Sequence, residues 1–103
     1  MKRFLIKYQL RNGTTEEWHG DIARFIAALD ADPGLQGRIS YRCMRSRDGK
    51  DYYHLAAAVD ETAIKDLQSR DFFKSYTERT RLVSGGTVEV LPLDIIAETR
   101  KGA

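Results

Sequence analysis

The sequence contains only one cysteine, Cys43, among its 103 residues. A single cysteine cannot form a disulfide within the chain, and we therefore expect a cytoplasmic protein. We interpret Cys43 as a small buried apolar side chain in a strand, because a catalytic thiol is the rarer use of a lone cysteine.

Long apolar runs are also missing. The chain opens with Met1, Lys2 and Arg3, but the apolar stretch of a secretory signal does not follow. No segment approaches the about 18 consecutive apolar residues of a membrane-spanning helix. We therefore expect a protein that is neither exported by a signal peptide nor inserted in a membrane.

An excess of charge of one sign is missing as well. The 17 Lys and Arg residues nearly balance the 15 Asp and Glu residues, which leaves a net charge of +2 and argues against a nucleic-acid partner. Four arginines do gather in one segment: Arg38, Arg42, Arg45 and Arg47. We interpret them as the solvated edge of a strand, with an anion site as the alternative.

The composition is that of one ordinary globular domain. Hydrophobic residues make up 42% of the sequence and charged residues 31%, at a length near that of a single hydrophobic core. We predict a single domain over 1–103, with its core in about 3–96 and a polar tail over 97–103.

The strongest local signal lies at the middle of the chain, in 38–59. Two β-prone runs flank the pair Asp48-Gly49, and this pair is typical of a short β-hairpin. We predict a hairpin closed by a type I′ turn, in which both Asp48 and Gly49 take a positive φ.

The segment before the hairpin predicts a strand and a helix. Alternating apolar residues over 3–10 indicate the strand. Thr14 and Glu17 match a capping box, so a helix over about 15–31 follows, with an apolar stripe along one face. The Asp-Pro-Gly sequence at 32–34 ends it.

The segment after the hairpin predicts a helix and a strand. Asp60 is the expected N-cap of a helix that continues to near Val83, with a kink around 69–71. A last strand is expected over 87–96. Pro92 has no amide donor, so it indicates a sheet edge, a bulge or the end of strand pairing.

The resulting order is β-α-β-β-α-β. With right-handed crossovers, this order predicts the α+β ferredoxin-like sandwich, in which two helices cover one face of a four-stranded antiparallel sheet of order 4-1-3-2. The other sheet face would be bare. Because Leu5, Leu55, Val59 and Leu91 indicate apolar residues on both faces, we expect a homodimer that packs sheet on sheet.

Several local features over about 3–96 resemble one family. They are Asp32-Pro33-Gly34 before the second strand, Tyr41 within it, Val59-Asp60-Glu61 at the start of the second helix, and Ser69 with Phe72-Phe73-Lys74-Ser75-Tyr76 within that helix. In these features the chain resembles the dimeric α+β barrel superfamily, and within it the antibiotic biosynthesis monooxygenases. The resemblance implies a cofactor-independent monooxygenase that acts on a small phenolic, quinol or polyketide-type substrate.

Two positions depart from that family. Many members carry a Trp near the place of Ala58 and a His near the place of Leu67. The departures favour an alternative, a non-catalytic dimeric ligand-binding or stress-response protein of the same fold. A cyclase or isomerase of the same superfamily is a third hypothesis.

Relatives bind ligands between the helices and the sheet, so we take the candidate site residues from the polar and aromatic residues expected there. His54 is the candidate catalytic base, because an imidazole can take a phenolic proton near neutral pH. The alternative is that His54 packs at the dimer face or bonds a backbone carbonyl. The candidate substrate-binding residues are Tyr8, Trp18, His19, Tyr41 and Tyr53.

Alternatives remain open for two of these candidates. Trp18 is interpreted first as a core residue and second as a substrate platform, and His19 first as a surface residue. The two histidines lack the spacing of metal ligands, so we expect no metal site.

Overall fold

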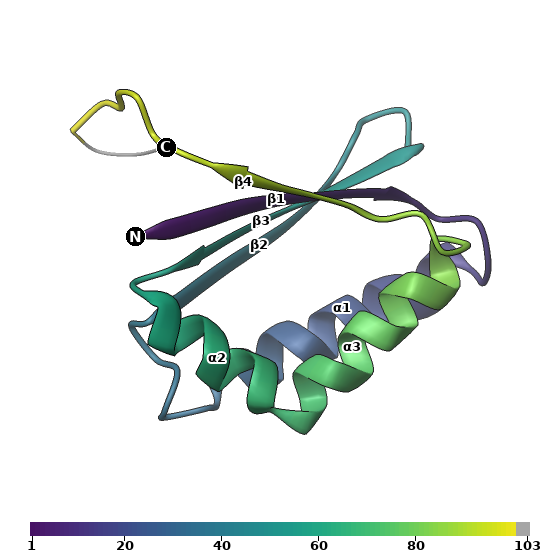
Figure 1. The fold of residues 1–103 in the computed structure, drawn as a ribbon. Helices are drawn as coiled ribbons and strands as arrows, with labels where there is room; N and C mark the ends of the chain where they lie inside the picture. The colour runs from purple at the N-terminus through teal and green to yellow at the C-terminus, as the bar shows by residue number, and fades with distance from the viewer. Residues whose placement is uncertain (101–103) are drawn as a thin grey trace.

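Four strands and three helices make up the part of the chain that the computed structural model describes, residues 1–100 (Figure 1). In chain order the elements are β1 (Lys2–Gln9), α1 (Thr15–Asp30), β2 (Ile39–Arg45), β3 (Asp51–Ala58), α2 (Glu61–Ser69), α3 (Asp71–Val83) and β4 (Glu89–Leu93). The last three residues of the predicted tail over 97–103 lie outside the described residues. No helix within residues 1–100 is long and apolar enough to cross a lipid bilayer.

The strands form one antiparallel sheet of order β2-β3-β1-β4. This is the predicted order 4-1-3-2 seen from the other edge, and the ferredoxin-like fold is confirmed. All three helices lie on one side of the sheet (Figure 1). β4 pairs only with β1, so Pro92 sits in an edge strand, the kind of strand to which a residue without an amide donor is ordinarily confined.

The central hairpin is confirmed, but the predicted type I′ turn is wrong. Gly49 has a φ of 79°, whereas no described residue other than glycine has a positive φ. β2 and β3 are joined by the longer loop 46–50, in which the amide of Gly49 donates to the carbonyl of Ser46 over 2.9 Å. The carboxylate of Asp48 accepts from the Ser46 hydroxyl and the Lys50 amide. These bonds hold Asp48 in an ordinary turn conformation, and only the glycine needs the left-handed region.

The predicted second helix is two helices. Asp60 caps α2 by accepting from the amide of Ala63 over 2.8 Å, as expected. The predicted kink is a complete break at Arg70, whose ψ of 132° is extended. Arg70 donates to the carboxylate of Asp32 over 2.7 Å, so an ion pair ties the break to the turn after α1. This hydrogen bond holds the pKa of Asp32 below its usual value.

The core lies between the helices and one face of the sheet. Along β1 and β3, every second residue turns toward the helices, as the burial of Tyr8, Tyr52 and His54 shows. Trp18 of α1 and Tyr76 of α3 pack against them, with their rings stacked 5.7 Å apart. The core is therefore unusually aromatic, and several of its members carry a polar atom that needs a partner.

The opposite sheet face carries an apolar row. Leu5 of β1 is directly paired with Leu55 of β3 and with Leu91 of β4, so the three side chains lie side by side across the sheet. Leu91 is 43% exposed. The helices leave this face bare (Figure 1), as expected for the sheet of a dimer.

Candidate functional site

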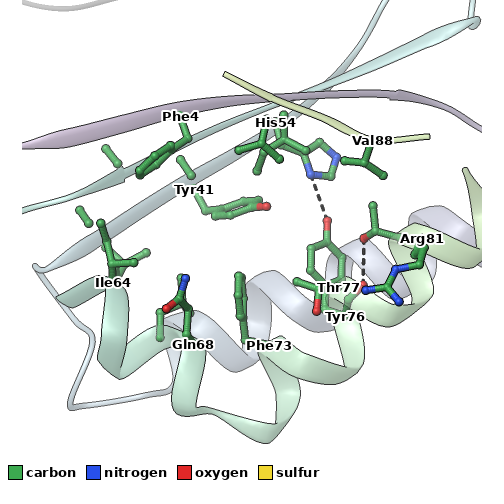
Figure 2. A pocket seen from close by; sticks show the side chains of 18 of the residues that line it. Phe4, Tyr41, His54, Ile64, Gln68, Phe73, Tyr76, Thr77, Arg81 and Val88 are labelled. Atoms are coloured by element: carbon green, nitrogen blue, oxygen red, sulfur yellow. Dashed lines mark hydrogen bonds between the residues drawn. The ribbon is translucent and has the colours of Figure 1, made fainter. Parts of the chain in front are cut away.

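A cavity of about 500 Å³ lies between the sheet and the helical layer (Figure 2). Its walls are mainly apolar. The apolar lining residues include Phe4, Ile6, Ile39, Ala56, Ala58, Ile64, Leu67, Phe73, Val88 and Val90. A volume of this size and an apolar lining suit a small ring system, because apolar burial supplies most of the binding free energy of such ligands.

Small side chains in β3 leave this space open. Ala56 and Ala58 both turn toward the helices and both line the cavity, together with Leu67 of α2. Ala58 and Leu67 are the positions at which the resemblance implies a Trp and a His. With alanine in place of an indole at position 58, the cavity keeps room that a larger side chain would occupy.

One wall of the cavity carries a buried histidine that is hydrogen-bonded on both sides. His54 of β3 is 1% exposed and lines the cavity. Its Nδ1 lies 3.1 Å from the phenol oxygen of Tyr76, which projects from α3, and Figure 2 shows this hydrogen bond joining the sheet to the helical layer beside the cavity. Its Nε2 lies 2.8 Å from the phenol oxygen of Tyr8. The ring is therefore fixed between two tyrosines.

Trp18 sets the direction of these hydrogen bonds. Its Nε1–H donates to the phenol oxygen of Tyr8 over 2.9 Å, and an indole can only donate. The Tyr8 hydroxyl then has its own proton free to donate to Nε2 of His54, which leaves the ring proton on Nδ1, where it donates to Tyr76. In this arrangement the hydroxyl proton of Tyr76 is free for the cavity or for Cys43, with which Tyr76 interacts.

Burial keeps all these groups uncharged at neutral pH. It lowers the pKa of His54 from 6.5 to about 4, because a charged imidazolium is poorly solvated in the core. Burial also raises the pKa of the phenols of Tyr8, Tyr41 and Tyr76, and it raises the pKa of the Cys43 thiol to about 11. The polar wall of the cavity is therefore a neutral network of donors and acceptors.

The cavity opens between the helices and the edge strand β4. Its exposed lining residues come from these elements and from the loop between them: Gln68, Thr77, Arg81, Gly86 and Val90. The buried lining residues, among them His54, Tyr76 and Thr80, lie deeper. A ligand that enters between α3 and β4 would meet polar side chains at the mouth and an apolar interior.

The candidate site residues occupy four different places. Tyr41 and His54 line the cavity. Tyr8 and Trp18 lie buried behind His54 and hold it by hydrogen bonds. His19 is exposed on α1, where its Nε2 lies 2.9 Å from the phenol oxygen of Tyr52.

Tyr53 lies on the bare face of the sheet, where the amino group of Lys7 sits 5.6 Å from its ring centre. It is therefore placed at the surface that would meet a second subunit, away from the cavity. Among residues 1–100, no three His, Cys, Asp or Glu side chains are grouped as metal ligands.

Most lining residues were missed by the sequence interpretation as parts of a site, Tyr76 and Arg81 among them. Tyr76 entered the sequence interpretation only as part of the Phe72-to-Tyr76 segment that resembles the family. Arg81 was not considered at all. Helical spacing puts Tyr76 on the inner face, but the sequence holds no signal that its hydroxyl meets His54, because that contact joins residues 22 positions apart.

Comparisons with known proteins agree with this fold. No protein-family model matches the chain, and no curated protein matches it in sequence. Among solved structures, the chain is similar to the cofactor-independent oxygenase SnoaB from Streptomyces nogalater (20% identity, 97% of each chain covered, TM-score 0.76). It is similar to an antibiotic biosynthesis monooxygenase (8% identity, 94% of this chain and 100% of that chain, TM-score 0.77).

A third similar structure is a dimeric ferredoxin-like protein of unknown function from Jannaschia sp. CCS1 (16% identity, 92% of this chain and 100% of that chain, TM-score 0.65). At these identities the similarity establishes the fold, and it confirms the fold that the resemblance implied. The chemistry of the cavity is a separate question.

Proposed function

We propose that the protein is a cofactor-independent monooxygenase-like enzyme that acts on a small phenolic, quinol or polyketide-type substrate. The observation that carries the proposal is the apolar cavity of about 500 Å³ whose polar wall is formed by His54 and Tyr76. An aromatic ring fills the apolar part, and its hydroxyl meets the phenol oxygen of Tyr76.

In this proposal His54 is the base, and Tyr76 connects it to the substrate. Both nitrogens of His54 are engaged by tyrosines, so a substrate reaches Nδ1 through the Tyr76 hydroxyl. The substrate donates its proton to the oxygen of Tyr76, and Tyr76 passes its own proton to Nδ1. This transfer needs the ring tautomer with its proton on Nε2. In that tautomer the oxygen of Tyr8 accepts from both Nε2 and the indole of Trp18, and the Tyr8 hydroxyl proton turns away from His54.

The reaction is balanced without another reductant. A bound phenolate is more electron-rich than the phenol and passes an electron to dioxygen. For a hydroquinone, one oxygen atom enters the ring to give a hydroxyquinone, and the other leaves as water together with two hydrogens of the substrate. The substrate itself supplies all four electrons that reduce dioxygen.

Oxygen uptake with a panel of hydroquinones tests the proposal. The wild-type protein is compared with His54→Gln, which keeps hydrogen-bonding groups in the wall but cannot take up a proton at neutral pH. His19→Gln is the matched control, since His19 lies outside the cavity. Uptake by the wild type and His19→Gln, with loss in His54→Gln, supports the proposal. Equal rates in all three proteins would remove His54 as the base.

A non-catalytic ligand-binding protein is the second candidate, and one observation favours it. The pKa of His54 is lowered to about 4, so the ring is a weak base at neutral pH. A binding protein would hold the same phenols without oxygen uptake. A cyclase or isomerase would convert its substrate without oxygen, so product analysis under anaerobic conditions separates it from the other two.

The assembly that fits this function is a homodimer joined through the bare sheet face. The apolar row of Leu5, Leu55 and Leu91 supplies a surface that water solvates poorly. At about 25 cal/mol per Å² of buried apolar area, an interface of ordinary size can overcome the cost of association. The cavities would then lie on the outer sides of the paired sheets, beneath each helical layer.

A further inference from the structure

Arg81 is the one formally charged side chain among the described residues that line the cavity. Figure 2 shows it on the helical side of the same end of the cavity to which Val88 contributes from the opposite side. No aspartate or glutamate within residues 1–100 belongs to the lining. The only charge that a bound ligand meets there is therefore positive.

The acidic residue that pairs with Arg81 leaves its guanidinium able to bind a ligand. Glu78 lies one turn earlier on α3, with its carboxylate 3.4 Å from a guanidinium nitrogen of Arg81. The side chains of Arg81 and Glu78 are 68% and 60% exposed, so water screens the pair and it contributes little free energy. A guanidinium has five N–H donors, and most of them remain free for a ligand.

The spacing along α3 fits a ligand with two polar ends. Tyr76 and Arg81 are five residues apart on one helix, which separates their backbones by about 7.5 Å along the axis and about 140° around it, and both side chains line the cavity. Thr77 and Thr80 lie between them, and both also line the cavity. A planar ligand of one or two rings can span this distance, with one polar group at each end.

We propose that the ligand of the cavity is an aromatic acid, whose ring hydroxyl meets Tyr76 and whose carboxylate is held by Arg81 at the mouth. This inference rests on the proposed function, because it names the substrate class of the same cavity. The apolar walls take the ring system. A cationic ligand is disfavoured, because it would bring a like charge to Arg81 and would find no carboxylate in the lining.

Calorimetric titration with a matched pair of probes tests this inference. The probes are a hydroxynaphthoate and the corresponding neutral hydroxynaphthamide, which share the ring and the hydroxyl. They are titrated into the wild type, Arg81→Gln and Arg47→Gln. Arg47 is exposed in the loop between β2 and β3, so its substitution removes the same charge without touching the cavity.

The wild type is expected to bind the acid about fivefold more tightly than the amide, as for an exposed charge-assisted contact. In Arg81→Gln the acid loses this advantage while the affinity of the amide stays the same, and Arg47→Gln behaves as the wild type. Equal wild-type affinities for acid and amide overturn the inference, as does a preference that survives in Arg81→Gln. Those results leave the proposed function standing. If neither probe binds, the proposed function fails as well.

Discussion

The phenol oxygen of Tyr8 lies 2.8 Å from Nε2 of His54, and the two residues are 3% and 1% exposed. This contact joins β1 to β3 within the core. Trp18 of α1 donates to the same phenol oxygen, and Tyr76 of α3 bonds the other side of the imidazole. Four elements thus meet in one buried polar network, and the cavity wall depends on it.

The network predicts that removing the phenol oxygen of Tyr8 lowers the stability of the protein. Tyr8→Phe leaves the indole N–H of Trp18 and Nε2 of His54 without this partner in a buried site. The free energy of unfolding is expected to fall by about 1–3 kcal/mol in urea denaturation, the typical cost of buried unsatisfied polar groups. Tyr53→Phe, on the bare sheet face, is the control and should change stability by less than about 0.5 kcal/mol. Equal effects of the two variants would mean that the network adds no stability.

The lowered pKa of His54 predicts that the protein is less stable in mild acid. The unfolded chain takes up a proton at His54 near its ordinary pKa of 6.5, whereas the folded protein resists until about 4. The contribution of His54 to the free energy of unfolding is therefore present above pH 6.5 and is lost as the pH falls toward 4. The total loss from this residue is about 3 kcal/mol. Between pH 7.5 and 5.5, urea denaturation should show a loss of about 1 kcal/mol from this residue.

The matched measurement uses His54→Gln, which has no titrating group at this position. The variant should lose less stability than the wild type over the same pH range. Identical pH profiles for the two proteins would show that His54 has the same pKa in the folded and unfolded states, contrary to its burial in the core.

The open space beside Ala58 predicts that a larger side chain blocks ligands without unfolding the protein. Ala58→Leu places a branched side chain in the cavity, so the affinity for a hydroxynaphthamide should fall about tenfold or more. Ala27→Leu, at an exposed position of α1, is the control and should bind as the wild type does. Unchanged binding in Ala58→Leu would place the ligand elsewhere.

The apolar row on the bare sheet face predicts a dimer that a single charge disrupts. Light scattering coupled to size-exclusion chromatography should give the wild type twice the monomer mass. Leu55→Lys should give the monomer mass, because a buried ammonium at the centre of the row is poorly solvated. Leu82→Lys, at an exposed position of α3, should remain dimeric. A wild type that stays monomeric at micromolar concentration rules out this assembly.

Much of the fold could be predicted from the sequence because its signals are local. Alternation separated the two faces of each strand, and Asp60 and Thr14 marked helix starts that the structure confirms. The β-α-β-β-α-β order with right-handed crossovers then predicted the sheet order that the structure confirms. The turn at Asp48 was predicted wrongly, because its side-chain bonds to Ser46 and Lys50 compete with the type I′ conformation.

The site was only partly predictable because its contacts are long-range. The sequence singled out His54 but left open whether it faces the helices or the dimer surface, and it did not indicate that Tyr8 and Tyr76 occupy both of its nitrogens. It also could not show that Ala56 and Ala58 leave space, since a small residue on an inner face is normally matched by a larger neighbour. Arg81 stands at a helix end where a charged residue is ordinary, so only the lining of the cavity distinguishes it.

The central claim is that a phenolic ligand reaches His54 through Tyr76, and nitrogen NMR of the imidazole tests it most directly. In the free protein at neutral pH, the hydrogen bonds from Trp18 through Tyr8 predict a neutral ring that carries its proton on Nδ1. Saturation with a hydroxynaphthamide is predicted to move that proton to Nε2 in the wild type and not in Tyr76→Phe. A ring that keeps its proton on Nδ1 in the saturated wild-type complex would contradict the account.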